Sequence, residues 1–336
     1  MKPLNCIVIG CGAIVEFQYV PAIKALKQLN VLALVDPNPS RVEAIAAKFP
    51  GARSLTHIGD VRADFAIVAS PAAYHAEQAI AALNAGMHVL CEKPMAANAA
   101  EAERMVEAAR RTGKLLAVGL FRRFFPATRT INDCILNATL GKAKRYSIAE
   151  GGEFNWPAVS ATFFQKQHAG GGVLLDLGSH TLDLVQHWFG EPTKVSYEDD
   201  ADGGLEATSC VQMEHPGGTT GEVRVSRDWR TANRYFIEFE RGWIAWRPSE
   251  ASKLEIGLVG GTFVGTVDLA EPANDWGEPG IGQPSLTYRQ CFTEQLAQFV
   301  EAICTGGQPV VTGMDGLRNL KLIERCYELK RLGGPG

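Results

Sequence analysis

The sequence of 336 residues lacks the features that mark several specialised classes of protein. No uncharged apolar run approaches the roughly 20 residues that a membrane-spanning helix requires, and the first apolar stretch is too short for a signal peptide. The chain also lacks a basic surplus, since 33 Lys and Arg stand against 37 Asp and Glu, for a net charge of −4. Without such a surplus a protein gathers little phosphate backbone. We therefore expect neither a membrane nor a nucleic-acid partner.

The cysteines are scattered rather than paired. None of the eight belongs to a Cys-x-x-Cys motif, so their spacing indicates neither a zinc cage nor the disulfide framework of a small secreted domain. Reduced thiols are typical of the cytoplasm, which is the location we expect. At roughly 150 residues per domain, the length predicts two domains. Glycine is the residue type in excess, with 35 positions, about a tenth of the chain against a typical ~7%.

The first third of the chain alternates short apolar runs with amphipathic stretches. We expect strands at residues 5–10, 31–36, 65–70, 88–91 and 115–120, and helices at 13–28 (with a kink at Pro21), 41–48, 72–84 and 98–111, the last two ending at Gly86 and Gly113. Runs that are apolar throughout are typical of parallel strands buried on both faces. The pattern predicts an α/β domain with a doubly wound (Rossmann) parallel sheet over residues 1–120.

The pattern changes after residue 120. Helices are expected after Pro126 and at 173–189, followed by strands that glycine-containing turns separate at 215–218, 241–242 and 260–261. Such turns are typical of an antiparallel sheet. We expect residues 121–336 to form an α+β domain with an open, mostly antiparallel sheet. Two helices close the chain at 287–305 and 316–331, the second capped by Thr312 or Asp315, and packing of these helices on the first domain stays open.

A glycine turn joins the first expected strand to the first expected helix, in the order Gly10-Cys11-Gly12-Ala13-Ile14-Val15. Gly10 permits a sharp turn and Gly12 lets a pyrophosphate approach the backbone. The helix that begins at Ala13 and Ile14 offers unpaired N–H groups to phosphate oxygens. Val15 departs from the fingerprint, which has Gly or Ala there. Glycines also serve packing alone at buried turns, so the motif needs support from a second position.

Asp36 gives that support. It ends the second expected strand, where a carboxylate accepts hydrogen bonds from the ribose hydroxyls of a dinucleotide and repels a 2′-phosphate. Its alternative role is to cap the turn Pro37-Asn38-Pro39. The turn and Asp36 together predict dinucleotide binding with NAD as the favoured cofactor, while Arg41 nearby leaves NADP open.

Two longer motifs carry a family resemblance. Glu92-Lys93-Pro94 follows an expected strand, and Gly170-Gly171-Gly172-Val173-Leu174-Leu175-Asp176-Leu177-Gly178-Ser179-His180 leads into an expected helix. With these motifs the sequence resembles the Gfo/Idh/MocA oxidoreductases, the group that includes glucose–fructose oxidoreductase and inositol dehydrogenase, over essentially the whole chain. Further matching segments are the glycine turn, Ser70-Pro71 with His75, Arg123-Phe124 and residues 310–317. Val15 and the Phe121-Arg122 lead-in depart from the family pattern.

The resemblance implies transfer of a hydride between a nicotinamide and a secondary alcohol or ketone of a sugar, cyclitol or sugar derivative. It implies that Lys93 and His180 are catalytic, with Asp176 as a supporting or second catalytic residue, and that these three and Arg123 meet the substrate. It places Ser70, Pro71, His75, Glu92 and Lys93 near the cofactor. It also implies that residues 121–336 bind the substrate and form the interface of a homodimer or homotetramer.

The residue types suit this chemistry. Oxidation of an alcohol needs a base matched to neutral pH, which His180 supplies, and a positive charge beside the developing alkoxide, which Lys93 supplies. Asp176 and His180 are four positions apart, so on a helix they share a face and the carboxylate can orient the imidazole. The alternative roles are a helix N-terminus for Asp176 and a core position for His180.

Other readings stay open. Asp176, His180, Asp183 and His187 form a helical stripe, but it spans about 16 Å, too long for one metal ion. Candidates for a polar pocket are Arg122, Trp156, Lys166, Tyr235 and Tyr288, while the cluster Arg227-Asp228-Trp229-Arg230 is either a ligand contact or a solvated strand end. Alternative functions are an NAD-retaining glycosidase and a non-catalytic NAD(P)-binding regulator of the same family. Whether the Lys93–Pro94 bond is cis is also open.

Overall fold

The computed structural model describes residues 3–59, 61–153, 170–228, 233–261, 263–269 and 286–331. The chain divides into two compact units. Unit 1 comprises Met1–Phe121, Pro157–Gly170 and Glu278–Leu320, and unit 2 comprises Arg122–Trp156, Gly171–Gly277 and Lys321–Gly336. Each unit has its own sheet and its own buried residues.

Unit 1 contains a six-stranded parallel sheet in the order β3-β2-β1-β4-β5-β6. Its strands are β1 (Leu4–Ile9), β2 (Leu29–Val35), β3 (Arg53–Leu55), β4 (Phe65–Val68), β5 (His88–Cys91) and β6 (Leu116–Val118). This order is that of the doubly wound dinucleotide-binding fold, in which ligands bind beyond the carboxyl ends of the strands where the order reverses. The reversal lies here between β1 and β4, and the predicted Rossmann sheet is confirmed.

Local sequence signals account for the helices of unit 1. These helices are η1 (Val15–Tyr19), α1 (Val20–Ala25), α2 (Pro39–Ala46), η2 (Ala72–Tyr74), α3 (His75–Asn84), α4 (Ala99–Thr112) and α8 (Leu286–Thr305). At the start of α4 the Asn98 side chain accepts a 2.9 Å hydrogen bond from the backbone N–H of Glu101, and Gly113 ends the helix in the left-handed conformation.

The first helix differs from the single segment expected at 13–28. Residues of η1 form a π-helical turn, and α1 follows with Pro21 in its first turn and ends at Ala25. Proline has no N–H to donate to the preceding turn, so that turn is able to widen without losing a hydrogen bond at this position. A π turn of this kind redirects the side chains that follow the glycine motif.

Helix α8 packs on the amino-terminal elements of unit 1. The ring of Phe292 meets Tyr19 edge-on with centroids 5.6 Å apart, and Phe299 meets Phe65 of β4 at 5.8 Å. Phe292 and Phe299 are both buried. Residues near the end of the sequence therefore help to cover the parallel sheet.

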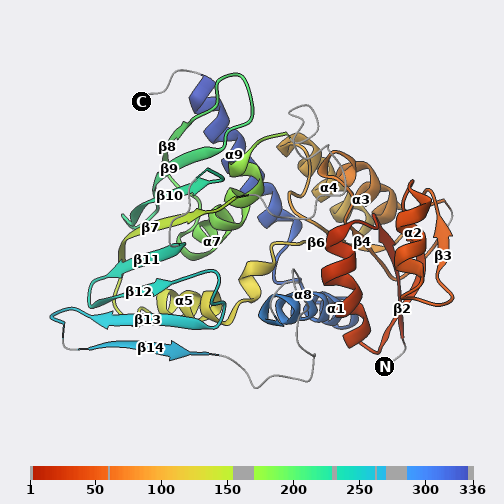
Figure 1. The fold of residues 1–336 in the computed structure, drawn as a ribbon, viewed down its shortest axis with the longest axis horizontal. Coiled ribbons are helices and arrows are strands. Elements are labelled where there is room, and N and C mark those ends of the chain that lie inside the picture. The colour runs from red at the N-terminus through yellow and green to blue at the C-terminus, as the bar shows by residue number, and fades with distance from the viewer. Residues whose placement is uncertain are drawn as a thin grey trace. The chain divides into compact units, whose positions relative to one another are not determined.

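Unit 2 contains an eight-stranded sheet in the order β14-β13-β12-β11-β7-β10-β9-β8 (Figure 1). The strands are β7 (Ala143–Gly151), β8 (Lys194–Asp199), β9 (Thr208–Glu214), β10 (Thr220–Ser226), β11 (Arg234–Phe239), β12 (Gly242–Trp246), β13 (Lys253–Leu258) and β14 (Val264–Asp268). All neighbours pair antiparallel except β7 and β10, which pair parallel. The prediction of an open, mostly antiparallel sheet is confirmed, and the three predicted turns join β9 to β10, β11 to β12 and β13 to β14.

The helices of unit 2 lie against this sheet and each other. Helix α5 (Pro126–Leu136) contacts β13 and α7 (Ser179–Phe189), and the π-helical turn η5 (Leu174–Gly178) precedes α7 and contacts β10. The short helix η3 (Phe121–Phe124) leads into α5. Helix α9 (Gly313–Arg331) closes the described chain, and its residues 313–320 belong to unit 1 while residues 321–331 belong to unit 2. Thr312 and Asp315 both take part in the α9 cap, since Asp315 Oδ2 accepts from the Thr312 N–H at 2.8 Å and Thr312 Oγ1 accepts from the Asp315 N–H at 3.3 Å.

Candidate active site

The glycine turn fits a dinucleotide. Gly10 has φ +90°, and a Cβ on it would lie 2.5 Å from the backbone nitrogen of Ser70, so only glycine packs at this junction of β1 and β4. At Gly12 a Cβ would meet no atom within 4 Å, so the backbone there has room for a phosphate group. Ala13 and Ile14 lead directly into η1, and the N–H groups of a first helical turn have no partner within the helix.

Asp36 and Arg41 hold the same turn from two sides. One oxygen of Asp36 accepts a 2.8 Å hydrogen bond from the N–H of Cys11, and the other accepts one of 2.9 Å from Asn38. Arg41 donates to the carbonyl of Cys11 at 2.9 Å and to the carboxylate of Glu16 at 2.9 Å. The cap role of Asp36 is thus present, and the two further lone pairs of the carboxylate stay compatible with ribose hydroxyls. Glu16 balances the charge of Arg41.

His75 is buried and links two segments of unit 1. Its Nε2 lies 2.6 Å from the carbonyl oxygen of Ser70, and its Nδ1 lies 2.9 Å from that of Pro94, across a cis Lys93–Pro94 bond. Burial lowers the pKa of His75, while its contacts with the Ser70 and Pro94 carbonyls act in the opposite direction. Ser70 donates from Oγ to Gln78 at 2.6 Å, and Pro71 precedes η2. His75 thereby ties the end of β4 to the segment that carries Lys93.

Glu92 lies in the core of unit 1, directly after β5. Its carboxylate accepts a 2.6 Å hydrogen bond from the hydroxyl of Tyr19 and one of 3.1 Å from the backbone N–H of Lys93. Burial raises the pKa of Glu92, and burial beside Glu92 raises that of Tyr19. The amide of Gln295 in α8 donates to the Tyr19 hydroxyl at 3.4 Å. The sequence analysis missed Tyr19 and Gln295, which follow no motif.

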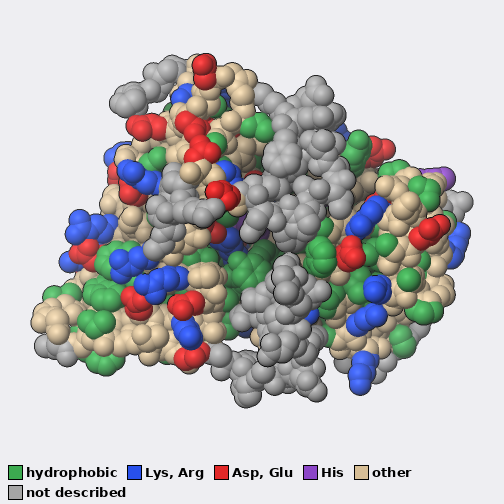
Figure 2. All heavy atoms as spheres, in the orientation of Figure 1, with side chains coloured by type: hydrophobic (Ala, Val, Ile, Leu, Met, Phe, Trp, Pro, Cys, Tyr) green, Lys and Arg blue, Asp and Glu red, His purple; other side chains and the backbone are tan. Residues whose placement is uncertain are grey.

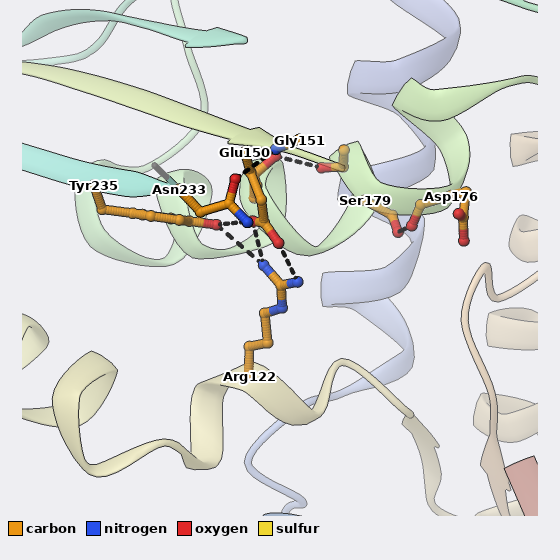
Figure 3. Close-up of polar contacts among 9 residues, drawn as sticks. Arg122, Glu150, Gly151, Asp176, Ser179, Asn233 and Tyr235 are labelled. Atoms are coloured by element: carbon orange, nitrogen blue, oxygen red, sulfur yellow. Dashed lines mark hydrogen bonds and ion pairs between the residues drawn. The ribbon is translucent and has the colours of Figure 1, made fainter. Parts of the chain in front are cut away.

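Asp176 and His180 lie on the helical segment formed by η5 and α7 in unit 2. Asp176 forms an ion pair with Arg227, which follows β10. Ser179 donates from its hydroxyl to the Asp176 carbonyl at 2.9 Å (Figure 3). His180 is buried. The sequence analysis left Arg227 between a ligand contact and a solvated strand end, and the structure makes it the partner of Asp176.

Two consecutive arginines each bind a buried carboxylate with two N–H groups. Arg122 meets both oxygens of Glu150 at 2.6 Å, and Tyr235 donates to the same carboxylate at 2.9 Å (Figure 3). Arg123 meets Asp183 of α7 at 2.9 and 2.6 Å. These paired guanidinium groups fasten η3 to β7 and to α7.

The remaining candidates divide as follows. Tyr288 packs on Phe121 within unit 1, with centroids 5.3 Å apart. Trp156, Lys166, Trp229 and Arg230 lie outside the described residues. Among the residues that are described, no group of three His, Cys, Asp or Glu side chains is placed to hold a metal ion.

Two whole-molecule properties complete the description. Within the described ranges, no helix is both long enough and apolar enough to cross a membrane. Lys and Arg side chains lie interspersed with Asp and Glu on the visible face of unit 2 (Figure 2).

Known proteins resemble the chain in both of its parts. A model described as "Oxidoreductase family, NAD-binding Rossmann fold" matches residues 4–120, and one for the GFO/IDH/MocA C-terminal domain matches residues 128–245. Trans-1,2-dihydrobenzene-1,2-diol dehydrogenase of Mus musculus is 31% identical over 66% of this chain and 68% of its own length. 1,5-anhydro-D-fructose reductase of Ensifer adhaerens is 28% identical over 93% of this chain and 92% of its own.

Two further comparisons differ in how much they cover. D-glucoside 3-dehydrogenase of Escherichia coli (strain K12) is 30% identical over 57% of this chain, which spans only 55% of that protein's length. The crystal structure of aldose-aldose oxidoreductase from Caulobacter crescentus, complexed with glycerol, has the same fold, with a TM-score of 0.85 at 24% identity over 99% of this chain and 98% of that one.

Proposed function

We propose a substrate class and residue roles for this chain from its family membership: it belongs to the Gfo/Idh/MocA oxidoreductases, as the resemblance predicted, and it is an NAD(P)-dependent enzyme. Its substrate is a secondary alcohol or ketone of a sugar, cyclitol or sugar derivative. The names of the relatives, which include a reductase of 1,5-anhydro-D-fructose and a dehydrogenase of a cyclic diol, support this class.

NAD is the favoured cofactor, and it supplies or accepts the hydride when bound. Gly10 and Gly12 with Ala13 and Ile14 hold the pyrophosphate, and Asp36 accepts from the ribose. Arg41 supports NAD rather than NADP, because its guanidinium already binds Glu16 and the Cys11 carbonyl. We propose that Ser70, Pro71, His75 and Glu92 lie near the cofactor. His75 and Glu92 also hold the segment that carries Lys93.

The residue roles follow from the chemistry of the alcohol. In the oxidative direction His180 accepts the hydroxyl proton and the ammonium of Lys93 stabilises the alkoxide. Asp176 holds a negative charge on the same helical segment and supports the protonated imidazole, while Arg227 holds Asp176. Arg123 acts through Asp183 by fastening α7, the helix that carries His180.

One observation carries the proposal most directly. Lys93 lies two positions after the end of β5, at the carboxyl edge of a parallel sheet, and its backbone N–H is anchored to buried Glu92 at 3.1 Å. Ligands of open α/β sheets bind beyond that edge. An anchored lysine there is placed to act on a bound substrate.

Ion pairing of three arginines in unit 2 supports an uncharged substrate. Arg122, Arg123 and Arg227 pair with Glu150, Asp183 and Asp176 respectively. A sugar acid or sugar phosphate needs a cation whose charge is not already neutralised.

The experiment is an absorbance screen at about 340 nm, where NADH absorbs and NAD does not. NAD and NADP are each combined with neutral sugars, inositols, sugar acids and nucleotide-sugars, and Lys93→Met serves as the inactive control. We expect substrate-dependent NADH formation that Lys93→Met lowers by about 100-fold or more. Full turnover by Lys93→Met would contradict the assignment. Sugar release without NADH accumulation would favour the glycosidase, and tight NAD binding without any turnover would favour the regulator.

Assembly and location complete the proposal. We place the enzyme in the cytoplasm as a homodimer or homotetramer. All eight cysteines are free thiols, which fits a reducing compartment. The exposed apolar side chains Val259, Phe263 and Val264 at the β13–β14 edge of the open sheet support association with further copies. Light scattering coupled to size-exclusion chromatography tests the oligomer.

A further inference from the structure

One residue accepts hydrogen bonds from the free backbone N–H groups at the start of the helical segment that carries Asp176 and His180. Glu206, a buried residue in the loop between β8 and β9, accepts from the N–H of Gly172 at 3.0 Å and from that of Leu174 at 3.1 Å. Its backbone carbonyl accepts from the N–H of Val173 at 3.0 Å. Three successive N–H groups that a helix leaves without internal partners are thus all bound by this residue, and a negative charge at this end is favourable to the helix dipole.

A tyrosine from the last helix completes the arrangement. Tyr327 of α9 donates from its hydroxyl to Glu206 at 2.7 Å. The Glu206 carboxylate therefore has three donors: the backbone N–H groups of Gly172 and Leu174 and the Tyr327 hydroxyl of α9. Such charge-assisted bonds are about twice as strong as bonds between neutral groups.

The close approach of Glu206 and Tyr327 explains why residues 171 and 172 are glycines. A Cβ on Gly172 would lie 2.2 Å from the Glu206 carbonyl oxygen and 2.8 Å from its carboxyl carbon. A Cβ on Gly171 would lie 2.3 Å from the Tyr327 hydroxyl. Both glycines are required by packing against these two side chains, and neither has a positive φ.

The same loop also holds the partner of Asp176. The carbonyl of Ala207, the residue after Glu206, accepts from the backbone N–H of Arg227 at 2.8 Å, and the Arg227 side chain pairs with Asp176. Two adjacent residues of one loop therefore set both members of the pair: Glu206 through the helix start and Ala207 through Arg227.

We propose that Glu206, together with Tyr327, is a positioning residue that sets the place of Asp176 and His180 through the start of their helix. It touches neither substrate nor cofactor in this role. The inference deepens the proposed function and rests on it for the catalytic roles of Asp176 and His180.

The kinetic test compares Glu206→Gln and Tyr327→Phe with Tyr146→Phe. Tyr146 is a suitable control because its buried hydroxyl bonds His215 at 2.9 Å elsewhere in unit 2. A glutamine keeps the volume of Glu206, and its one oxygen can still accept from Leu174 and Tyr327. It removes the negative charge at the helix start and turns an N–H group, instead of the second carboxylate oxygen, towards the N–H of Gly172. We expect kcat to fall about 10- to 100-fold in Glu206→Gln, less in Tyr327→Phe and not in Tyr146→Phe, with the dissociation constant for NADH unchanged. Unchanged kcat in Glu206→Gln would overturn the proposal.

A second readout does not depend on turnover, so failure of the proposed function is told apart from failure of this inference. The protein with isotope-labelled histidine is titrated by NMR, with His180→Gln used to assign the His180 signal, and hydrogen exchange is followed by mass spectrometry at residues 172–176. We expect Glu206→Gln to speed exchange there and to shift the His180 signal. Faster exchange with an unmoved His180 signal would mean that Glu206 serves stability alone, and it would overturn the inference even for an enzyme whose substrate is not yet found.

Discussion

The hydroxyl of Tyr19 donates a 2.6 Å hydrogen bond to the buried carboxylate of Glu92, which lies 73 positions later in the chain. Tyr19 ends the π turn that follows the glycine motif, and Glu92 anchors the backbone of Lys93. The bond thus joins the segment expected to bind the cofactor to the segment that carries Lys93, the proposed catalytic lysine, within unit 1.

Tyr19→Phe tests this link. The variant keeps the ring that packs on Phe292 and removes only the hydroxyl, which leaves one oxygen of Glu92 without that donor. We expect a loss of about 1–3 kcal/mol in the free energy of unfolding and a lower kcat. Urea unfolding and steady-state kinetics measure the two effects. Tyr74→Phe is the control, because Tyr74 is exposed, and equal behaviour of the two variants would refute the link.

The protonation of Glu92 gives stability a defined dependence on pH. Burial raises its pKa above the ordinary value of 4.5, so between that value and the raised one the folded state binds more protons than the unfolded state. The stabilisation that protonated Glu92 gives to the folded state is therefore fully present below about pH 4.5. It is lost as the pH rises through the raised pKa that Glu92 has in the folded state. Glutamine does not titrate, so we expect wild type to lose stability relative to Glu92→Gln as the pH rises from about 4.5 through the raised pKa of Glu92. A difference that stays constant with pH would contradict a raised pKa.

Cofactor choice depends on the pair formed by Arg41 and Glu16. Because Glu16 neutralises Arg41 at 2.9 Å, Glu16→Gln frees a guanidinium near the position of a 2′-phosphate. We expect this variant to raise kcat/KM for NADP relative to NAD by several-fold, about 1 kcal/mol as for a partly exposed ion pair. Glu43→Gln on α2 is the control, since Glu43 is exposed. An unchanged ratio in Glu16→Gln would show that Arg41 has no part in cofactor choice.

The layout of unit 1 could be predicted because its signals are local. Apolar runs mark the buried strands, Asn98 caps α4, and Gly113 ends it. Strand β7 was missed for the opposite reason. Its buried positions alternate as Tyr146, Ile148 and Glu150. The burial of Glu150 depends on Arg122, a residue 28 positions earlier, so the apolar alternation is cut to two residues and is too short to mark the strand.

The candidate site shows the same division. Motifs pointed to Lys93, Asp176 and His180, because these residues lie beside glycines and a proline in recognisable order. Their supports, Glu206 and Arg227, occupy loop positions without a motif and are identified only by the hydrogen bonds they make across the fold. Polar partners chosen by tertiary contact leave no periodic signal in a single sequence.

The pair of Arg122 and Glu150 lets the energy of a buried salt bridge be measured against an exposed one on the same strand. Both side chains are only 7% exposed, so Arg122→Met leaves a carboxylate buried without its cation and we expect a loss of about 3–5 kcal/mol in unfolding free energy. Arg122→Met combined with Glu150→Met removes both charges and recovers most of that loss. Arg145→Met is the matched control, because Arg145 of β7 pairs with Glu238 while 72% exposed, and its loss should stay below about 1 kcal/mol. Urea unfolding of wild type and the three variants measures these differences. A double variant no more stable than Arg122→Met would show that packing, rather than the unpaired carboxylate, causes the loss.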